Sequence, residues 1–318
     1  MKAIATADLH LDINNRFEDT KSVLHQMATY AIMNKVEQFW ILGDIYDKKR
    51  PCSSEIVLFH QFVKSLTDSN IAVEMISGNH DIDKHQVSSL QELAVWDLPN
   101  VVLHANPFVI NFDEHRVYLG HHLVIGAKLG ALYYSSRHEI PLAKILETPA
   151  NLYLLGDVHK AQKLHSNPDV LYVGSPERVD FGERDEVKGF TLLNSVNGDL
   201  KYKFILLETR RMIQYDYTFN ENGFTELGCN SFPDAIVKLK INCTKEKYKE
   251  INEKEIRLRL SKAYSLKIEY NIIREDRTRN SDISESVNPA DAFLNYAKEK
   301  EFDKQTINAG LEIIQELK

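Results

Sequence analysis

The sequence predicts an α/β protein with a layered first domain and a smaller second unit. Short aliphatic or β-branched runs recur along the first two thirds of the chain, several of them bounded by Gly, Asp or Asn, as is typical of buried strands. Between the early runs, apolar residues lie three and four positions apart, which is the spacing of amphipathic helices. Strands that alternate with helices indicate a layered α/β fold. A chain of 318 residues is long enough for one large domain and a smaller one.

The elements of the first domain follow from these runs in order. We expect strands at 2–7, 38–42, 72–77, 116–120, 151–155, 170–173, 189–193 and 202–207. We expect helices at 18–35 and 54–68, because both segments repeat their apolar residues with helical spacing. These elements together predict a first domain over residues 1–207.

A second unit is predicted over residues 208–274. Residues 235–241 alternate like a strand, 245–263 form a charged amphipathic helix, and 265–273 form another strand. A β-α-β unit of this size buries little core alone, so we expect it to pack on the first domain.

The last part of the chain is predicted to be a linker followed by two helices. Residues 275–288 contain two aliphatic residues and no aromatic residue, which indicates a linker. Asn288-Pro289 is a favourable helix start, and two amphipathic helices are expected within 289–318. Their apolar faces leave two alternatives: they fold back on the main domain, or they dock on a partner helix.

Composition indicates an ordinary globular protein. Hydrophobic residues make up 43% of the chain and charged residues 27%. The three cysteines, Cys52, Cys229 and Cys243, show no C-x-x-C spacing and are expected to be reduced thiols. No apolar stretch approaches the ~20 residues that cross a bilayer, and no signal-peptide pattern precedes Asp8. We therefore expect a soluble cytoplasmic protein without a membrane partner.

The charge distribution is uneven. The net charge of −7 argues against a generic nucleic-acid binder. However, residues 201–280 hold 17 Lys and Arg against 12 Asp and Glu, a local +5, which leaves −12 for the rest. A basic surface beside an acidic metal site suits a phosphodiester, and an ordinary lysine-rich solvated surface is the alternative interpretation.

Five polar stretches each follow directly on an apolar run. They are Asp8-Leu9-His10, Gly43-Asp44, Gly78-Asn79-His80-Asp81, Gly120-His121-His122 and Gly156-Asp157-Val158-His159. The carboxyl ends of parallel strands meet at one edge of a sheet, and Asp, His and Asn are ligands for divalent cations. Any one stretch is also explained by turn chemistry, but five together predict two-metal hydrolysis of a phosphate ester.

The residue types suggest separate roles within this site. Asp8 and His10 are two positions apart, so an extended strand end points both to the same side. Asp44 has two carboxylate oxygens with which to bridge two ions, and Asn79 offers a neutral carbonyl oxygen. His80 follows Asn79 directly and is expected to point toward substrate, where it can protonate the leaving alkoxide.

The remaining ligands are expected to come from the last two stretches, as His121, Asp157 and His159. Two divalent ions bring a charge of +4, while Asp8 and Asp44 bring −2 and Asp157, if it ligates, brings −1. The loaded site therefore stays positive, attracts a phosphodiester and lowers the pKa of a bridging water.

These motifs, in this order, resemble the calcineurin-like metallophosphoesterases and, among them, the SbcD-type nucleases. The narrower resemblance lies in three features: Gly120-His121-His122-Leu-Val-Ile-Gly126-Ala127, the segment from Gly174-Ser175-Pro176-Glu177-Arg178 to Gly182, and the β-α-β unit with trailing helices. It implies a four-layered β-sandwich flanked by helices, a small DNA-capping domain, and C-terminal helices that bind an ATPase. The short C-terminus resembles that of compact bacteriophage versions, which would act in the host cytoplasm.

The resemblance also implies ligand roles and partners. Asp8, His10 and His159 would bind one ion, Asn79 and His121 the other, with Asp44 shared and His80 as the catalytic acid. The ions would be Mn²⁺, with Mg²⁺ as the alternative. The partners would be DNA and an SbcC-type SMC-like ATPase, with a homodimer inside a heterotetramer.

One position departs from the family pattern, which reads Gly-His-x-His where this chain has Gly156-Asp157-Val158-His159. Asp157 either ligates through oxygen or leaves the second ion weakly held. Arg50 and Arg178 are expected near the site, as phosphate contacts or as structural salt bridges.

The function expected from all this is a DNA nuclease that cuts duplex ends as an exonuclease and single strands or hairpins as an endonuclease. The alternatives are a phosphodiesterase or phosphatase for a small or protein substrate, and a DNA-end-binding scaffold whose metal site is impaired at Asp157.

Overall fold

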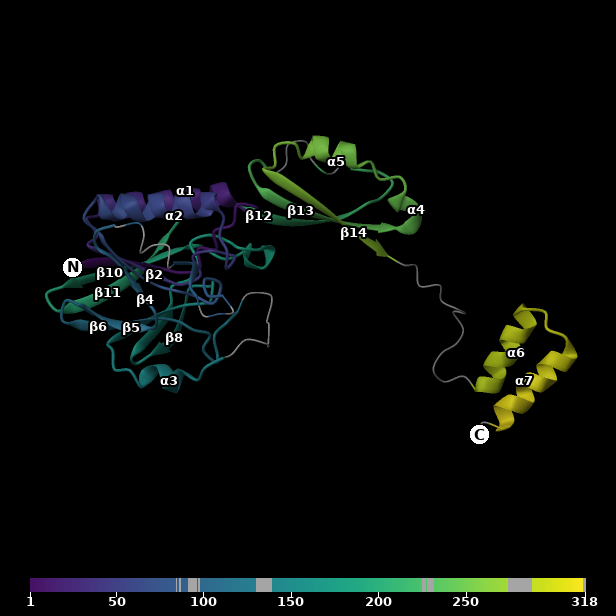
Figure 1. The fold of residues 1–318 in the computed structure, drawn as a ribbon. Coiled ribbons are helices and arrows are strands. Elements are labelled where there is room, and N and C mark those ends of the chain that lie inside the picture. Colours follow the sequence, from purple (N-terminus) through teal and green to yellow (C-terminus); the bar gives the residue numbers. More distant parts are fainter. Residues whose placement is uncertain are drawn as a thin grey trace.

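Two β-sheets lie face to face in the first part of the chain, with helices on both outer sides (Figure 1). A computed structural model describes residues 1–83, 85, 87–90, 96, 98–129, 139–224, 227, 232–273 and 288–316. The first sheet has the order β11-β10-β1-β2-β3-β4. Its strands are β1 (Lys2–Thr6), β2 (Gln38–Leu42), β3 (Ala72–Ile76), β4 (Val101–His104), β10 (Gly189–Val196) and β11 (Asp199–Leu206). Strands β1 to β4 are parallel to one another, and β10 and β11 are added antiparallel.

The second sheet has the order β5-β6-β7-β9-β8. Its strands are β5 (Phe108–Phe112), β6 (His115–His121), β7 (Leu152–Gly156), β8 (Gln162–Ser166) and β9 (Asp169–Tyr172). Here β6, β7 and β9 run parallel, while β5 and β8 pair antiparallel at the two edges. The sequence analysis predicts β6, β7 and β9 but omits β4, β5 and β8.

Helices complete a four-layered arrangement, as the sequence predicts. Helices α1 (Phe17–Met33) and α2 (Ser53–Thr67) pack through their apolar sides on the outer face of the first sheet. The short helix α3 (Leu142–Leu146) packs through Ile145 on the outer face of the second sheet. In Figure 1, α1 and α2 lie on one side of the paired sheets and α3 on the other.

One core lies between the two sheets, and a larger one lies between the first sheet and helices α1 and α2. Trp40 and Leu42 of the first sheet meet Leu119 and Leu154 of the second, and all four are fully buried. Because β1 and β2 are covered by helices on one face and by the second sheet on the other, they appear in the sequence as unbroken apolar runs. This double burial is why their positions are predicted almost to the residue.

A smaller, three-stranded parallel sheet follows, formed by β12 (Met212–Thr218), β13 (Ile236–Thr244) and β14 (Ser265–Ile273). One face is covered by an apolar cluster that includes Leu239, Ile241 and Ile256. The predicted β-α-β unit is therefore incomplete, because β12 is a third strand of the same sheet. The boundary at residue 208, drawn as a domain boundary, stays a prediction.

The single helix predicted at 245–263 is wrong. The structure has two short helices, α4 (Lys245–Tyr248) and α5 (Glu253–Arg259). The side chain of Asn252 accepts a hydrogen bond from the backbone N–H of Lys254 at 3.1 Å and so starts a new helix. Asn is a strong helix-capping residue, and its bond to the backbone competes with continuation of the preceding helix.

The last described segment is a helical hairpin of α6 (Pro289–Glu299) and α7 (Lys304–Glu316). Asn288 caps α6 by accepting from the N–H of Ala290 at 3.1 Å, which confirms the predicted helix start. The predicted linker, 275–288, lies outside the described residues except for Asn288. Among the helices that the structure describes, none combines the length and apolar character needed to cross a membrane.

Candidate metal centre

The five polar stretches converge at one edge of the paired sheets. Asp8 and His10 follow β1, Asp44 follows β2, and Asn79 and His80 follow β3, all in the first sheet. His121 ends β6, and Asp157 and His159 follow β7, in the second sheet. The structure thus brings every predicted ligand and the predicted acid to the same place. Their roles as ligands and acid remain predictions, which the geometry below supports.

Among the residues that the structure describes, three groups of side chains have the geometry to hold a cation, with ligand atoms within 4.8 Å of one another in each group. The groups are Asp8 with His10 and His159, Asp8 with Asp44 and His121, and His10 with Asp44 and His80. Because Asp8, His10 and Asp44 each belong to two groups, the ligand sets are adjacent and share members. Shared carboxylates between neighbouring ligand sets are what a two-metal site requires.

His10 and His159 present their Nε2 atoms to each other at 3.0 Å. The Nδ1–H of His159 donates to Glu183 Oε1 at 2.6 Å, which leaves the Nε2 lone pair free. Nδ1 of His10 lies 3.4 Å from Asp47 Oδ1 on its other side. A ligand histidine that donates its second ring nitrogen to a carboxylate is the usual arrangement around protein-bound metals.

His121 is oriented in a similar way from the opposite sheet. Its Nδ1–H donates to the backbone carbonyl of Leu42 at 2.6 Å, and Nε2 lies 3.2 Å from Asn79 Oδ1 and 3.4 Å from Asp44 Oδ2. Burial alone lowers the pKa of His121, but the carboxylates of Asp44, Asp8 and Asp157 outweigh burial and raise it to about 10. This proton occupies a position of strong negative potential, which a divalent cation can take instead.

The carboxylates also fit a cation. Burial alone would raise the pKa of Asp44, but the histidines around it hold that pKa well below its usual range. Within the described residues, Oδ2 of Asp8 is buried and has no hydrogen-bond partner. A buried carboxylate oxygen without a partner is costly unless a cation lies beside it. The residues present therefore fit a pair of divalent ions.

Backbone conformation distinguishes these positions as well. Asp8, His10, Asp44 and Asp157 have φ values of 55°, 43°, 52° and 84°. Positive φ is uncommon for residues other than glycine and costs about 1–3 kcal/mol each where the surroundings enforce it. Four of the seven predicted ligands thus have strained backbone, and such strain is concentrated at functional sites.

Close backbone approach makes Gly78 necessary. A Cβ atom at Gly78 would lie 2.1 Å from Asp44 Oδ1, so no other residue leaves room for this carboxylate. The N–H of Gly78 donates to the buried Asp81 carboxylate at 2.9 Å, and Asp81 also accepts from the N–H groups of Ile45 and Tyr46. Burial, and then the charge of Asp44, raise the pKa of Asp81 to about 6. Asp81 therefore ties the β2 and β3 loops together, a role that the sequence analysis does not assign.

His80 lies at the side of the ligand groups. Its ring Nδ1–H donates to the backbone carbonyl of Asp47 at 2.8 Å, and its backbone N–H donates to Asp44 Oδ1 at 2.8 Å. The Nε2 atom is left to face the site, where it can hold or release a proton. A ring nitrogen also lies within reach of the His10 and Asp44 ligand atoms, so the geometry permits a ligand role too.

Glu183 and Lys188 also support the site, although the sequence did not point to either residue. Glu183 accepts from His159 and pairs with Lys188 Nζ at 2.7 Å, and the Lys188 side chain is fully buried. Burial alone raises the pKa of Glu183, but the bond from His159 and the charge of Lys188 outweigh burial and lower it to about 2. Glu183 follows directly on the Gly174–Gly182 motif, so extending that motif by one residue would have included it.

Arg50 and Arg178, the two arginines expected near the site, have different surroundings. The Arg178 guanidinium donates to Thr209 Oγ1 at 2.6 Å and to the carbonyls of Arg210 and Glu186. These bonds agree with the structural alternative for Arg178, and its contact with phosphate stays a prediction. Arg50 is exposed in the segment after β2, and its contact with phosphate stays a prediction.

Comparisons with known proteins agree with this geometry. Residues 1–188 match the family described as calcineurin-like phosphoesterase, and the chain belongs to this family. It is 23% identical over 271 residues to the SbcD component of the nuclease SbcCD of Staphylococcus saprophyticus, a match that covers 67% of this chain and 71% of that protein. It is 26% identical over 115 residues to DNA double-strand break repair protein Mre11 of Saccharolobus solfataricus, covering 34% and 30%. Vps29 of Chaetomium thermophilum is similar with a TM-score of 0.38 and 14% identity, covering 70% of this chain and 89% of that one.

A substitution at Asp157 tests whether this residue is a metal ligand. Its carboxylate lies 3.7 Å from His121 Nε2, beside the ligand groups. A carboxylate favours hard ions such as Mn²⁺ and Mg²⁺, so Asp157→His is expected to shift preference toward nitrogen-loving metals while activity persists. Calorimetric titration with Mn²⁺ and Zn²⁺ measures this shift. An unchanged metal profile in Asp157→His, with full activity in Asp157→Ala, would show that Asp157 is not a ligand.

Proposed function

We propose that this chain is a DNA nuclease that hydrolyses phosphodiester bonds with two divalent cations. The proposed ion is Mn²⁺, with Mg²⁺ as the alternative. The observation that carries the proposal is the set of adjacent ligand groups that share Asp8, His10 and Asp44. Such a pair of ions supplies charge stabilisation at the phosphate oxygens and lowers the pKa of a water in the site. Membership of the phosphoesterase family and similarity to a protein named as part of a nuclease support the same chemistry.

We assign a separate role in metal binding or proton transfer to each residue of the site. Asp8, His10 and His159 hold one ion, Asn79 and His121 hold the other, and Asp44 lies between them, as the shared groups suggest. Glu183 and the carbonyl of Leu42 orient the two outer histidines. His80, held by the carbonyl of Asp47, gives its Nε2 proton to the leaving alkoxide, which otherwise departs poorly.

DNA is proposed as the substrate because of the small sheet. On the face opposite α5, Gln214, Lys238 and Lys267 lie side by side across the three strands. Lys267 is exposed and Lys238 is half-buried, and residues 201–280 carry a net charge of +5, which attracts a polyanion and steers its approach. We infer that duplex ends are degraded by exonuclease action and that single strands or hairpins are cut internally.

Cleavage of labelled DNA in the presence and absence of Mn²⁺ tests the proposal. We expect degradation of a duplex and of a hairpin that stops with EDTA and is absent from Asp44→Ala. Hydrolysis of bis-p-nitrophenyl phosphate without DNA cleavage would instead indicate a phosphodiesterase for small substrates. DNA binding without any hydrolysis would indicate an end-binding scaffold.

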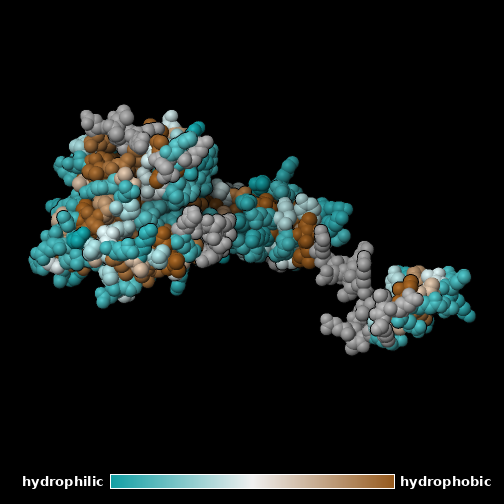
Figure 2. All heavy atoms as spheres, turned by 60° about the horizontal axis from the view of Figure 1, so that its bottom comes forward, coloured by the Kyte–Doolittle hydropathy of each residue, from teal (hydrophilic) through white to brown (hydrophobic). Residues whose placement is uncertain are grey.

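The proposed partners are an SbcC-type SMC-like ATPase and a second copy of this chain. The α6–α7 hairpin is the proposed ATPase-binding element, because Leu294, Tyr296 and Ile313 are at least 40% exposed on short helices. Figure 2 shows apolar side chains on the surface of this hairpin. Short amphipathic helices gain most of their stability from packing on another surface, and a coiled coil offers one.

Removing this hairpin is expected to separate partner binding from catalysis. Deleting residues 276–318 should abolish binding to the ATPase and any ATP-stimulated activity, while cleavage of short DNA in the absence of ATPase persists. Pull-down of the purified ATPase measures this. The double variant Leu294→Glu/Ile313→Glu should fail in the same way, whereas Leu258→Glu, at an exposed apolar residue of α5, should bind normally. Equal binding by full-length and truncated chains would place the docking surface elsewhere.

A further inference from the structure

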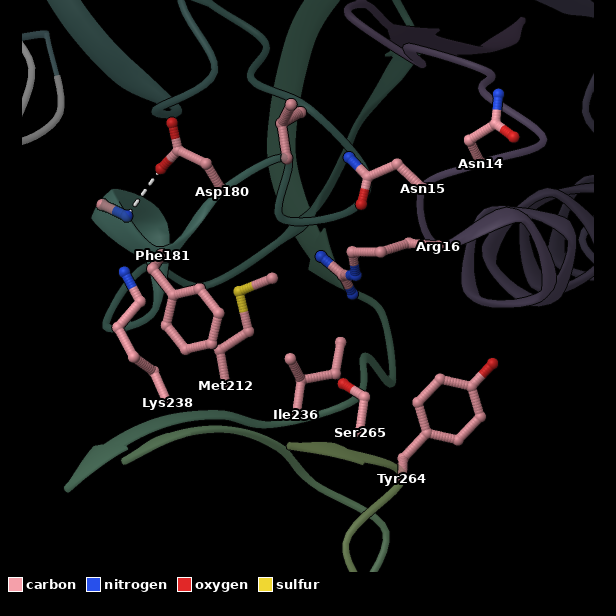
Figure 3. Close-up of a pocket in the computed structure, with 12 residues that line it drawn as sticks. Asn14, Asn15, Arg16, Asp180, Phe181, Met212, Ile236, Lys238, Tyr264 and Ser265 are labelled. Atoms are coloured by element: carbon pink, nitrogen blue, oxygen red, sulfur yellow. Dashed lines mark hydrogen bonds between the residues drawn. The ribbon is translucent and has the colours of Figure 1, made fainter. Parts of the chain in front are cut away.

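A cavity of about 570 Å³ lies where the small sheet meets two loops of the first domain (Figure 3). One loop is the segment between β1 and α1, which contributes Asn14, Asn15 and Arg16. The other is the segment 179–182, and the floor is formed by the beginnings of the three strands of the small sheet. This volume is within the range of about 300–1,000 Å³ that small-ligand pockets occupy.

The floor and walls of the cavity are largely apolar and aromatic. Met212, Ile236 and Ser265 are direct neighbours across the sheet and form the floor. In Figure 3, Phe181 and Tyr264 stand on opposite sides of this floor. The guanidinium of Arg210 lies 3.7 Å from the centre of the Tyr264 ring and supports this ring. Arg210 itself does not line the cavity.

The cations that border the cavity are already paired. Arg16 lies 2.9 Å from Glu177 Oε1 and 3.4 Å from Asp19 Oδ2. Lys238 Nζ lies 4.6 Å from the centre of the Phe181 ring and 3.8 Å from Glu269. The cavity is therefore a poor receptor for a phosphate, which needs unpaired cations or free N–H groups. It suits an uncharged planar ring with polar edges, since it combines aromatic faces with the amides of Asn14 and Asn15 at its border.

The loops around the cavity are continuous with the metal centre. The segment that carries Asp8 and His10 runs on to Asn15, and the segment that lines the cavity at 179–182 runs on to Glu183, which bonds His159. On the sheet, the apolar row at the floor is followed by the row that contains Lys238 and Lys267. A planar group in the cavity thus lies next to the row that contains Lys238, and two loops of the cavity lead along the chain to residues of the metal centre.

We propose that this cavity binds one unpaired nucleobase of a DNA strand. The inference rests on the proposed nuclease function, which it deepens by naming single-stranded DNA as the species that the site selects. The base stacks against Tyr264 or Phe181, and the adjoining backbone stays outside the cavity, where the net charge of +5 over residues 201–280 attracts it. Blunt duplex DNA has no free base for the cavity and gains nothing from it.

Binding without hydrolysis tests this inference. Fluorescence anisotropy of the full-length protein in EDTA compares a single-stranded oligonucleotide, the same strand with abasic sites, and a blunt duplex. Tyr264→Leu is expected to weaken binding of the single strand about tenfold, as loss of one base–aromatic stack of ~1–3 kcal/mol predicts. It should leave the affinities for the abasic strand and the duplex unchanged. Phe181→Leu and the cavity-filling Ser265→Leu are expected to act alike, so the result does not depend on one variant folding well.

Tyr248→Leu is the matched control, because Tyr248 is 42% exposed on the same unit, against 50% for Tyr264, and lies outside the cavity. The inference is overturned if Tyr264→Leu and Ser265→Leu bind the single strand as the unmodified chain does, or if they lose single strand and duplex equally. If the protein cleaves DNA but Tyr264→Leu leaves its affinity for single-stranded DNA unchanged, the base-binding role of the cavity is refuted and the nuclease proposal stands. A Tyr264-dependent preference for single strands without Mn²⁺-dependent cleavage would refute the nuclease proposal alone.

Discussion

Replacement of His80 by Ala is expected to slow metal-dependent cleavage by about 10²–10⁴-fold, the usual contribution of a positioned general acid. Metal binding should be nearly unchanged, because His80 is bonded to the carbonyl of Asp47, while the proposed ligands Asn79 and His121 face each other at 3.2 Å. Calorimetric titration with Mn²⁺, alongside cleavage rates, measures both quantities on the same preparation.

Asp44→Ala provides the contrast. Asp44 is a member of two ligand groups and is surrounded by His10, His80 and His121, so its removal should lose both cleavage and tight metal binding. If His80→Ala loses an ion as completely as Asp44→Ala does, then His80 is a ligand, as its place in one of the groups permits. In that event the proton donor must be sought elsewhere.

Replacement of Lys188 by Met is expected to lower the free energy of unfolding by about 3–5 kcal/mol. Lys188 has a fully buried side chain and lies 2.7 Å from Glu183 and 3.1 Å from Glu186, so its loss leaves buried carboxylates without their cation. Chemical denaturation measures the change. Lys163→Met is the matched control: Lys163 pairs with Asp169 at 2.6 Å, but its side chain is 43% exposed, so the midpoint should hardly move.

The buried ion pair of Lys188 with Glu183 should also influence the metal centre, because Glu183 accepts a hydrogen bond from His159. Glu183→Gln keeps the shape of the side chain but weakens the acceptor for His159 Nδ1–H, so metal affinity should fall by about 10–100-fold. Calorimetry with Mn²⁺ measures this independently of catalysis. An unchanged affinity in a folded Glu183→Gln variant would show that Glu183 supports the fold and not the ligand.

Most strands of the first domain and the location of the metal centre could be predicted from the amino-acid sequence. Strands such as β2 are buried on both faces, and this produces apolar runs that are visible without knowledge of any partner. The polar residues at their ends stand out because burial is interrupted there. Parallel strands of one sheet share one carboxyl edge, so the convergence of Asp8 and Asp44 followed from the order of the elements. His121 ends β6 in the second sheet, so its place beside them depends on how the two sheets pack.

Features that depend on distant partners became visible only in three dimensions. Glu183 supports His159 from 24 positions away in the chain, and Arg178 donates to Thr209, 31 positions away, whereas the sequence left both a phosphate contact and a structural role open for Arg178. Local pattern carries no record of such pairs, because side-chain hydrogen bonds are satisfied by whichever partner the fold brings near. By contrast, the helix predicted at 245–263 is wrong for a local reason: the side chain of Asn252 accepts from the N–H of Lys254, two residues further on, and so begins a new helix. The cavity beside Tyr264 is a property of packing, since it exists only where the small sheet meets the loops that lead from the metal ligands.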